Sequence, residues 1–346
     1  MELFDRVVLM SKLGEVMRAL SQNEKWSSDL PVSESRYQGL TEAIQKAHIY
    51  NGWFTEEAVR DSMGGIATWL NQDALTKWAK PTFEQDATKK VAIIMAGNIP
   101  LVGFHDFLSV FMSGKRSLIK LSSDDRQLFP VILECMREMN PGIHQWIELR
   151  EARLKGFDAV IATGSNNSAN YFESYFGKYP HIIRKNRHSV AVLTGSETKE
   201  DMMKLGKDVF QYFGLGCRNV TQLLIPADFK LNRIFEGFYG FNEIINHHKY
   251  ANNYDYNKAI HLMNKDKLLD NGFLLLKEDE RLASPLGMLH YRYYNSPEEL
   301  KEILAQNENE IQAVLGQDYI PFGKSQKPGL EDYADCVNTL EFLAKI

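Results

Sequence analysis

Apolar residues recur every three or four positions in the first 80 residues, which is the spacing of one buried face of an α-helix. Leu9, Leu13, Val16 and Leu20 form one such face, and a second amphipathic run occupies residues 53–69. The pattern predicts a helical N-terminal layer.

The pattern changes after residue 90, where short apolar runs typical of buried strands alternate with helical runs. Strands are expected at 91–95, 117–121 and 159–165, and helices at 101–112, at 125–139 and from Ala169 onward. Because strand and helix alternate, the chain is expected to form a parallel sheet in an α/β fold.

The alternation resumes after Arg187. A strand is expected at 190–193, a helix at 199–213 and a strand at 220–226, followed by mixed helix at 234–269. These elements predict a second α/β domain, and we place the domain boundary near Arg187.

Composition and charge exclude several classes of protein. The 346 residues are 44% hydrophobic and 25% charged, which is enough apolar material for one or two cores and is not typical of a disordered chain. A net charge of −5 gives no general attraction to the phosphates of nucleic acids, so no nucleic-acid partner is expected.

The longest apolar stretch, residues 91–112, is interrupted by Asn98, Pro100, His105 and Asp106, so no membrane span is expected. The charged N-terminus does not resemble a secretory signal. Three scattered cysteines indicate neither a disulfide framework nor a structural zinc site. We expect a cytoplasmic protein.

One cysteine lies where a substrate could reach it. Cys217 belongs to the run Gly214-Leu-Gly-Cys-Arg-Asn, between a predicted helix and a predicted strand. Glycines allow a tight turn, and main-chain N–H groups together with Arg218 can stabilise a thiolate that attacks a carbonyl. The alternative is a small core residue, which is our interpretation of Cys135.

Polar residues follow the predicted strands of the first sheet. Asn98 follows the first strand, Lys120 and Ser123 the second, and Gly164 and Ser165 the third. Parallel sheets collect ligands outside the carboxyl ends of their strands, where an amide can donate to an oxyanion and N–H groups can hold a phosphate. Asn98 also has a structural alternative as a turn residue, and the segment that contains Lys120 and Ser123 has one as a strand end followed by a helix cap.

A histidine offers general acid or base chemistry. His188, just before a predicted strand, can serve as a proton donor or base, or be a surface histidine beside basic neighbours. The histidines show no metal-binding spacing, and we expect no catalytic metal.

The order of the motifs resembles the aldehyde dehydrogenase superfamily. The motifs are Ala96-Gly-Asn-Ile-Pro-Leu, Gly114-Lys-Arg-Ser-Leu-Ile-Lys-Leu-Ser-Ser, Thr163-Gly-Ser, Gly216-Cys-Arg and Pro321-Phe-Gly. The short length, the loop around Cys217 and the run Asp332-Tyr-Ala-Asp-Cys-Val-Asn-Thr-Leu-Glu-Phe-Leu are similar to the LuxC-type acyl-CoA reductases. The resemblance covers approximately residues 90–346.

The resemblance implies a Rossmann-like, parallel-sheet cofactor domain and a second α/β catalytic domain. We expect an N-terminal helical layer packed on the cofactor domain at 1–85, an NADP(H)-binding domain at 86–188, a catalytic domain at 189–320, and a C-terminal loop and tail at 321–346.

The resemblance also assigns roles to single residues. Cys217 would be the acylated nucleophile, and its backbone N–H would form the oxyanion hole with the Asn98 side chain. Lys120 would hold the adenosine ribose, and Ser165, with Gly164, would approach the pyrophosphate. The site loop, formed by Pro321, Phe322 and Gly323, would close part of the site.

Departures from the superfamily pattern favour reduction of a thioester. Where many NAD-dependent members have a ribose-binding glutamate, this chain has Ser123, which leaves room for a 2′-phosphate and favours NADPH. The general-base glutamate has no counterpart, because Ile182-Ile-Arg-Lys-Asn-Arg-His occupies its region. Hydrolysis of a thioacyl enzyme needs that base, whereas reduction does not. Which acid seats the nicotinamide ribose is open among Glu278, Asp279 and Glu280.

The leading hypothesis is a reductase that converts an acyl-CoA, with a fatty acyl group as the expected substrate, to an aldehyde through an S-acyl-cysteine. One alternative is an aldehyde or semialdehyde dehydrogenase acting on a small substrate. Another is a non-catalytic acyl- or nucleotide-binding subunit. A homo-oligomer and an acyl-activating partner protein are both compatible with the resemblance.

Overall fold

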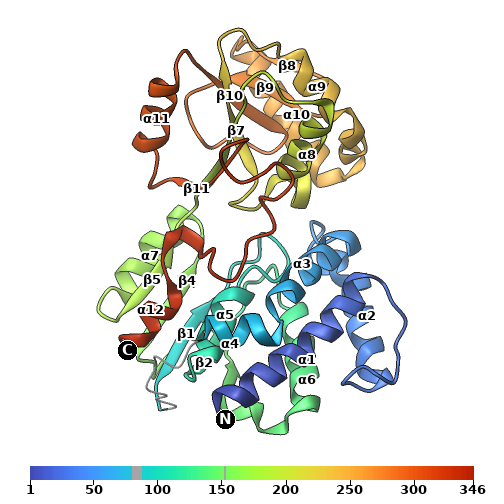
Figure 1. The fold of residues 1–346 in the computed structure, drawn as a ribbon, viewed down its shortest axis with the longest axis vertical. Coiled ribbons are helices and arrows are strands. Elements are labelled where there is room, and N and C mark those ends of the chain that lie inside the picture. Colours follow the sequence, from blue (N-terminus) through green and yellow to red (C-terminus); the bar gives the residue numbers. More distant parts are fainter. Residues whose placement is uncertain (80–87, 152) are drawn as a thin grey trace. The chain divides into compact units, whose positions relative to one another are not determined.

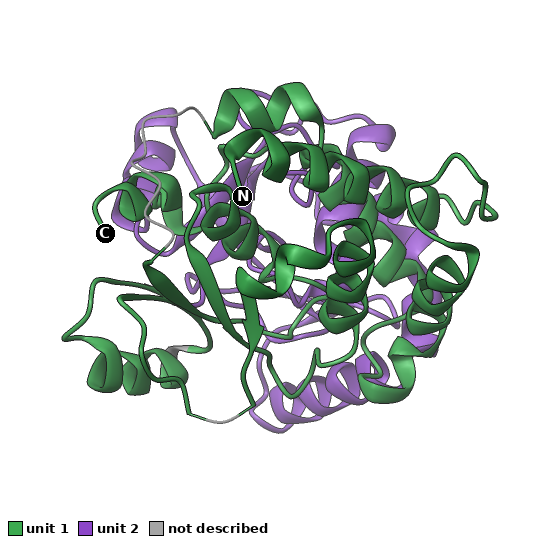
Figure 2. Ribbon diagram, turned by 90° about the horizontal axis from the view of Figure 1, so that it is seen from below, with its two compact units in different colours: residues 1–185, 329–346 green, residues 186–328 purple. Residues whose placement is uncertain are grey.

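The structure is a computed structural model that describes residues 1–79, 88–151 and 153–346. The chain divides into two compact units (Figure 2). Unit 1 comprises residues 1–185 and 329–346, and unit 2 comprises residues 186–328. The expected limit of the N-terminal layer at residue 85 lies outside the described residues.

Unit 1 begins with the predicted helical layer (Figure 1). Its helices are α1 (Leu3–Ser21), α2 (Glu34–Tyr50), α3 (Glu56–Trp69) and α4 (Gln72–Trp78). The predicted face of α1 is buried, with Leu13 and Val16 at most 1% exposed. The side chains of Ser33, Thr55 and Asn71 accept hydrogen bonds from N–H groups in the first turns of α2, α3 and α4, which fixes where each helix begins.

The first sheet has parallel strands in the order β3-β2-β1-β4-β5. The strands are β1 (Lys90–Ile94), β2 (Arg116–Lys120), β3 (Ile147–Leu149), β4 (Ala159–Thr163) and β5 (His181–Arg184). The helices between them are α5 (Phe104–Met112), α6 (Leu128–Met139) and α7 (Asn166–Phe176). The predicted parallel α/β sheet is confirmed, while the outer strands β3 and β5 were not predicted.

Unit 2 contains a second sheet in the order β11-β6-β7-β10-β9-β8, in which only the pair β8–β9 is antiparallel among the described strands. Its strands are β6 (His188–Val192), β7 (Val220–Pro226), β8 (Leu269–Asp270), β9 (Leu275–Glu278), β10 (Met288–Tyr294) and β11 (Ile311–Leu315). Its α-helices are α8 (Lys199–Phe210), α9 (Asn232–Phe238), α10 (His248–Met263) and α11 (Pro297–Gln306). The second α/β sheet is therefore confirmed.

Two predicted helix limits were wrong for local reasons. The helix expected over 199–213 ends at Phe210, because Tyr212 and Phe213 adopt left-handed conformations with φ of 52° and 59°. The helix expected from Ala169 begins at Asn166, because Ser165 caps it.

None of the helices that the structure describes is long and apolar enough to cross a membrane.

A buried arginine joins the two chain segments that make up unit 1. Arg184, 3% exposed, makes two bonds to the carboxylate of Asp106, at 2.7 and 3.2 Å. The same guanidinium donates to the Ala334 carbonyl at 2.6 Å and to the Thr339 hydroxyl at 2.9 Å. Thr339 is the first residue of α12 (Thr339–Ala344), so the ion pair also holds the C-terminal segment.

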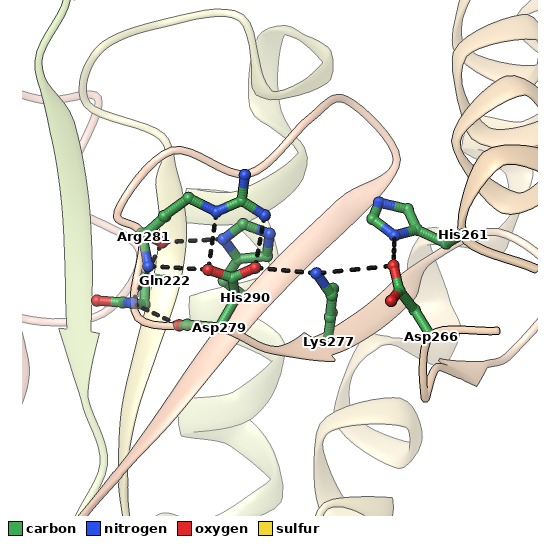
Figure 3. A network of polar contacts seen from close by, with 7 residues as sticks. All are labelled: Gln222, His261, Asp266, Lys277, Asp279, Arg281 and His290. Carbon is green, nitrogen blue, oxygen red and sulfur yellow. Dashed lines mark hydrogen bonds and ion pairs between the residues drawn. The ribbon is translucent and has the colours of Figure 1, made fainter. Parts of the chain in front are cut away.

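A second polar network holds the loop between β9 and β10 (Figure 3). Asp279 accepts hydrogen bonds from Arg281, at 2.6 and 2.9 Å, and from Lys277, at 3.0 Å. Beneath the loop, Gln222 donates to the carbonyls of Asp279 and Arg281, and Nδ1 of His290 lies 2.9 Å from the Arg281 carbonyl oxygen. His290 and Gln222 are register partners on β10 and β7, and both are fully buried.

Removing the guanidinium of Arg184 should strongly destabilise the protein. Arg184→Met leaves the Asp106 carboxylate buried without its cation, and we expect a loss of about 3–5 kcal/mol in the free energy of unfolding. Because the double variant Arg184→Met/Asp106→Leu removes the stranded charge, it should recover part of the loss. Urea unfolding of the full chain measures both values, and a single variant as stable as the wild type contradicts this role.

Burial lowers the pKa of His290 from its ordinary value of 6.5, so the folded protein favours the neutral imidazole. The neutral state contributes stability above pH 6.5, and this contribution is lost as the pH falls through the lowered pKa. His290→Leu should therefore show a smaller fall in apparent melting temperature than the wild type between pH 7.5 and 5.5. Equal falls in the two proteins would refute this assignment.

Candidate active site

Cys217 lies on a short loop just before β7, at the amino-terminal end of that strand in the second sheet. The loop follows the 3-10 turn η2 (Gln211–Gly214) and precedes β7, and the Cys217 side chain is exposed. The main-chain carbonyl of Cys217 accepts a hydrogen bond of 3.0 Å from the Ser189 hydroxyl of β6. The loop is thus attached to the strand beside β7, and Cys217 is an exposed residue of unit 2.

A buried asparagine fixes the conformation of this loop. Asn219 is 0% exposed, and its side-chain oxygen accepts the N–H of Gly216 at 2.8 Å. Its own N–H donates to the Gly216 carbonyl at 3.0 Å. Its amide nitrogen donates to the carbonyls of Asp208, Val209 and Gln211, at 3.0, 3.3 and 2.8 Å. Asn219 therefore holds the residue before Cys217 against the end of α8.

The turn that leads into the loop is strained. Tyr212, Phe213 and Gly214 have successive φ values of 52°, 59° and 83°. Such a conformation costs a residue with a side chain about 1–2 kcal/mol, and glycine avoids that cost. The Phe213 ring packs 4.2 Å from the His247 ring. This ring contact and the burial of Tyr212 support the strained turn that precedes Cys217.

The predicted site loop is bound to the same helix. The carboxylate of Asp208 in α8 accepts the N–H groups of Gly323 and Ser325 at 2.5 and 3.0 Å. Burial raises the pKa of Asp208 even though these hydrogen bonds favour its ionised form. Asp208 therefore contacts the site loop through its carboxylate and Asn219 through its carbonyl.

His188 is the first residue of β6 and is half-buried. Its N–H donates to the Glu310 carbonyl at 2.9 Å, and burial lowers the pKa of its imidazole. The next residue, Ser189, is the one that holds the Cys217 carbonyl. His188, whose neutral form is favoured, therefore lies at the amino-terminal end of β6, beside the strand that the Cys217 loop precedes.

The remaining predicted residues lie at the carboxyl ends of β1, β2 and β4 in unit 1. Asn98 and Ser123 are exposed in the loops after β1 and β2, and Lys120 is the half-buried last residue of β2. Gly164 and Ser165 follow β4 directly. Because β1 is hydrogen-bonded to both β2 and β4 in parallel, these residues share one sheet edge.

Two residues that sequence reasoning missed support these loops. The amide of Asn51 donates to the Asp124 carbonyl at 3.2 Å and lies 3.5 Å from the Gly97 carbonyl oxygen. Asp125 accepts the N–H of Leu101 at 2.9 Å, and burial raises its pKa to about 6. The loop that carries Asn98 is therefore tied to the loop that carries Ser123.

The turn after β4 brings a helix close to the sheet edge. A Cβ atom on Gly164 would lie 2.8 Å from Ser168 Cβ and 3.0 Å from the Phe172 ring, so only glycine fits there. The Ser165 hydroxyl accepts the Ser168 N–H at 3.3 Å and caps α7. Ser165 thus has a structural role as a helix cap, and its contact with a pyrophosphate stays a prediction.

The predicted residues thus form two groups. Unit 1 contains Asn98, Lys120, Ser123, Gly164 and Ser165, and unit 2 contains Cys217, His188 and the site loop. Within the described ranges, no group of three or more histidine, cysteine, aspartate or glutamate residues is arranged to hold a metal ion.

Comparisons of sequence and of structure give different results. No protein-family model matches the chain. No curated protein matches it in sequence either.

Solved structures, in contrast, match almost the whole chain. Aldehyde dehydrogenase 21 of Physcomitrella patens, solved with its product succinate, matches 92% of this chain and 74% of its own, with a TM-score of 0.64 and 10% identity. The indole-3-acetaldehyde dehydrogenase AldA of P. syringae, bound to NAD+ and IAA, matches 91% of this chain and 72% of its own, with a TM-score of 0.63 and 13% identity.

An aldehyde dehydrogenase from Bacillus cereus in complex with NAD+ also matches 91% of this chain and 72% of its own, with a TM-score of 0.61 and 10% identity. These structural neighbours are members of the aldehyde dehydrogenase superfamily. The chain has the aldehyde dehydrogenase fold.

Proposed function

We propose that the protein is an NADPH-dependent acyl-CoA reductase that forms an S-acyl intermediate on Cys217 and releases an aldehyde. The observation that supports this proposal most directly is the exposed Cys217 thiol on a loop fixed by the buried Asn219, in a chain with the aldehyde dehydrogenase fold. A fixed loop favours catalysis because its N–H groups need no rearrangement as charge develops.

The first proposed step is transfer of the acyl group. The Cys217 thiolate attacks the thioester carbonyl, a carbon–sulfur bond to Cys217 forms, and the bond to the CoA sulfur breaks as CoA leaves as a thiolate. The Asn98 amide and the Cys217 N–H are the proposed donors to the oxyanion. His188, whose lowered pKa favours the neutral form, is proposed to take the proton that the Cys217 thiol loses and then to donate it to the departing CoA thiolate.

The sequence around β5 supports reduction over hydrolysis. The region where the superfamily has its water-activating glutamate contains Arg184, which is committed to the ion pair with Asp106. Neither Lys185 nor Asn186, the residues that follow, carries a carboxylate. Without that base, a thioacyl enzyme is poorly hydrolysed, so reduction to aldehyde is the favoured outcome.

The carboxyl edge of the first sheet fits a dinucleotide. Lys120 and Ser123 offer an ammonium and a neutral hydroxyl for the adenosine ribose and its 2′-phosphate, and the glycine turn at Gly164 leaves the N-terminus of α7 close to the edge for the pyrophosphate. A bound NADPH would supply the hydride that reduces the acyl carbon.

The network around Asp279 narrows the choice of nicotinamide-ribose ligand. The Arg281 guanidinium bonded to Asp279, with Lys277 beside it, holds the pKa of that carboxylate far below its usual value. The Asp279 carboxylate is therefore already bound by two side chains of the protein. Glu278 and Glu280, both exposed, are the acids that we propose for this contact.

Loss of the thiol should abolish turnover. Cys217→Ala should lower acyl-CoA-dependent NADPH oxidation by about 1,000-fold or more, because the covalent intermediate cannot form. Cys336→Ser, which changes another exposed cysteine, should retain activity. Retained turnover in Cys217→Ala would refute the proposal. Oxidation of a small aldehyde to its acid with NADP+ or NAD+, without reduction of acyl-CoA by NADPH, would favour a small-substrate dehydrogenase.

The cofactor preference should depend on Ser123. Ser123→Glu places a carboxylate where the 2′-phosphate is proposed to lie, so the Kd for NADPH should rise about tenfold or more while the Kd for NADH changes little. Fluorescence titration measures both constants, with Ser122→Ala as the neighbouring control. An unchanged ratio of the two constants would show that Ser123 does not face the 2′ position.

A further inference from the structure

The side chain of Gln326 lies on the loop of Cys217. Its amide nitrogen and oxygen are 3.4 and 3.7 Å from the position that a Cβ atom on Gly216 would take. Gly216 directly precedes Cys217, so the Gln326 amide lies against the residue before the proposed nucleophile. This contact lies wholly within unit 2.

The amide nitrogen of Gln326 is buried and has no hydrogen-bond partner among the residues that the structure describes. An unpaired buried donor costs about 1–3 kcal/mol, so a protein seldom retains one without a compensating contact. Gly216, the backbone neighbour nearest to this amide, makes its hydrogen bonds to Asn219 and none to Gln326. The missing acceptor is best supplied by a ligand.

Gln326 is held firmly in this position. The Asp208 carboxylate binds the N–H groups of Gly323 and Ser325, which is the residue before Gln326. The carbonyl of the same Asp208 accepts a hydrogen bond from the Asn219 amide, which fixes Gly216. One residue of α8 thus sets the position of Gln326 relative to the Cys217 loop.

We propose that Gln326 is a catalytic hydrogen-bond donor to the carbonyl oxygen of the acyl group as it is transferred to Cys217. This inference rests on the proposed function. As the Cys217 sulfur bonds to the carbonyl carbon, negative charge develops on that oxygen, and it returns to the carbonyl when CoA leaves. A neutral amide that is already desolvated and positioned stabilises this charge without rearrangement.

The test compares two reactions of the same thiol. Acylation by an acyl-CoA without NADPH generates an oxyanion, whereas alkylation by iodoacetamide displaces iodide and generates none. Gln326→Leu should slow acylation by about 10- to 100-fold, and Gln326→Glu, which replaces the donor by a carboxylate, should slow it more. Gln326→Leu, which introduces no charge, should not slow alkylation, whereas the carboxylate of Gln326→Glu disfavours the thiolate and should slow alkylation as well. Gln317→Leu is the control, since Gln317 is exposed and donates to the Ser196 hydroxyl at 3.1 Å.

Mass spectrometry of the quenched protein measures both rates, and melting temperatures show whether the variants fold. Unchanged acylation in Gln326→Leu would overturn this role, as would an equal fall in acylation and alkylation, which would indicate that Gln326 only positions the loop. A wild-type protein that is alkylated but never acylated would overturn the proposed function and, with it, the role of Gln326.

Discussion

The buried amide of Asn219 is the interaction on which the candidate site depends. It satisfies three carbonyls at the end of α8, and it accepts the N–H of Gly216. Removing it would leave several buried polar groups unpaired, each at a cost of about 1–3 kcal/mol. Few other side chains carry both donor and acceptor in the same planar group, so an asparagine at this place is a requirement of the loop's geometry.

The strained turn before the Cys217 loop and the hydrogen bonds that fix the loop both involve the C-terminal end of α8. Left-handed residues at Tyr212 and Phe213 end α8 early, and this abrupt ending exposes the carbonyls that Asn219 binds. Asp208 then uses its carboxylate to hold residues 323–325. The end of α8 therefore fixes two segments that are distant in the sequence. One is the Cys217 loop, and the other is the segment 323–325, more than 100 residues later.

The sequence predicted those elements whose apolar runs are continuous. Strands β1, β4 and β7 have buried centres and lie where expected, whereas β3 has three residues and β10 mixes charged and aromatic residues, so neither shows a strand pattern. Parallel topology alone placed Asn98 and Lys120 at one sheet edge. Asn219, Asp208 and Asn51 act through buried hydrogen bonds, several of them between distant segments, which no local spacing reveals.

Cys217 is the residue that we propose to carry the acyl group. Peptide mapping by mass spectrometry, after the protein is mixed with an acyl-CoA and quenched in acid without NADPH, identifies the acylated residue. We expect an acyl adduct on the peptide that contains Cys217, and we expect it to be lost when NADPH is added and aldehyde is released. A protein that turns over acyl-CoA with no adduct on this peptide, or with the adduct on another residue, would contradict this role of Cys217.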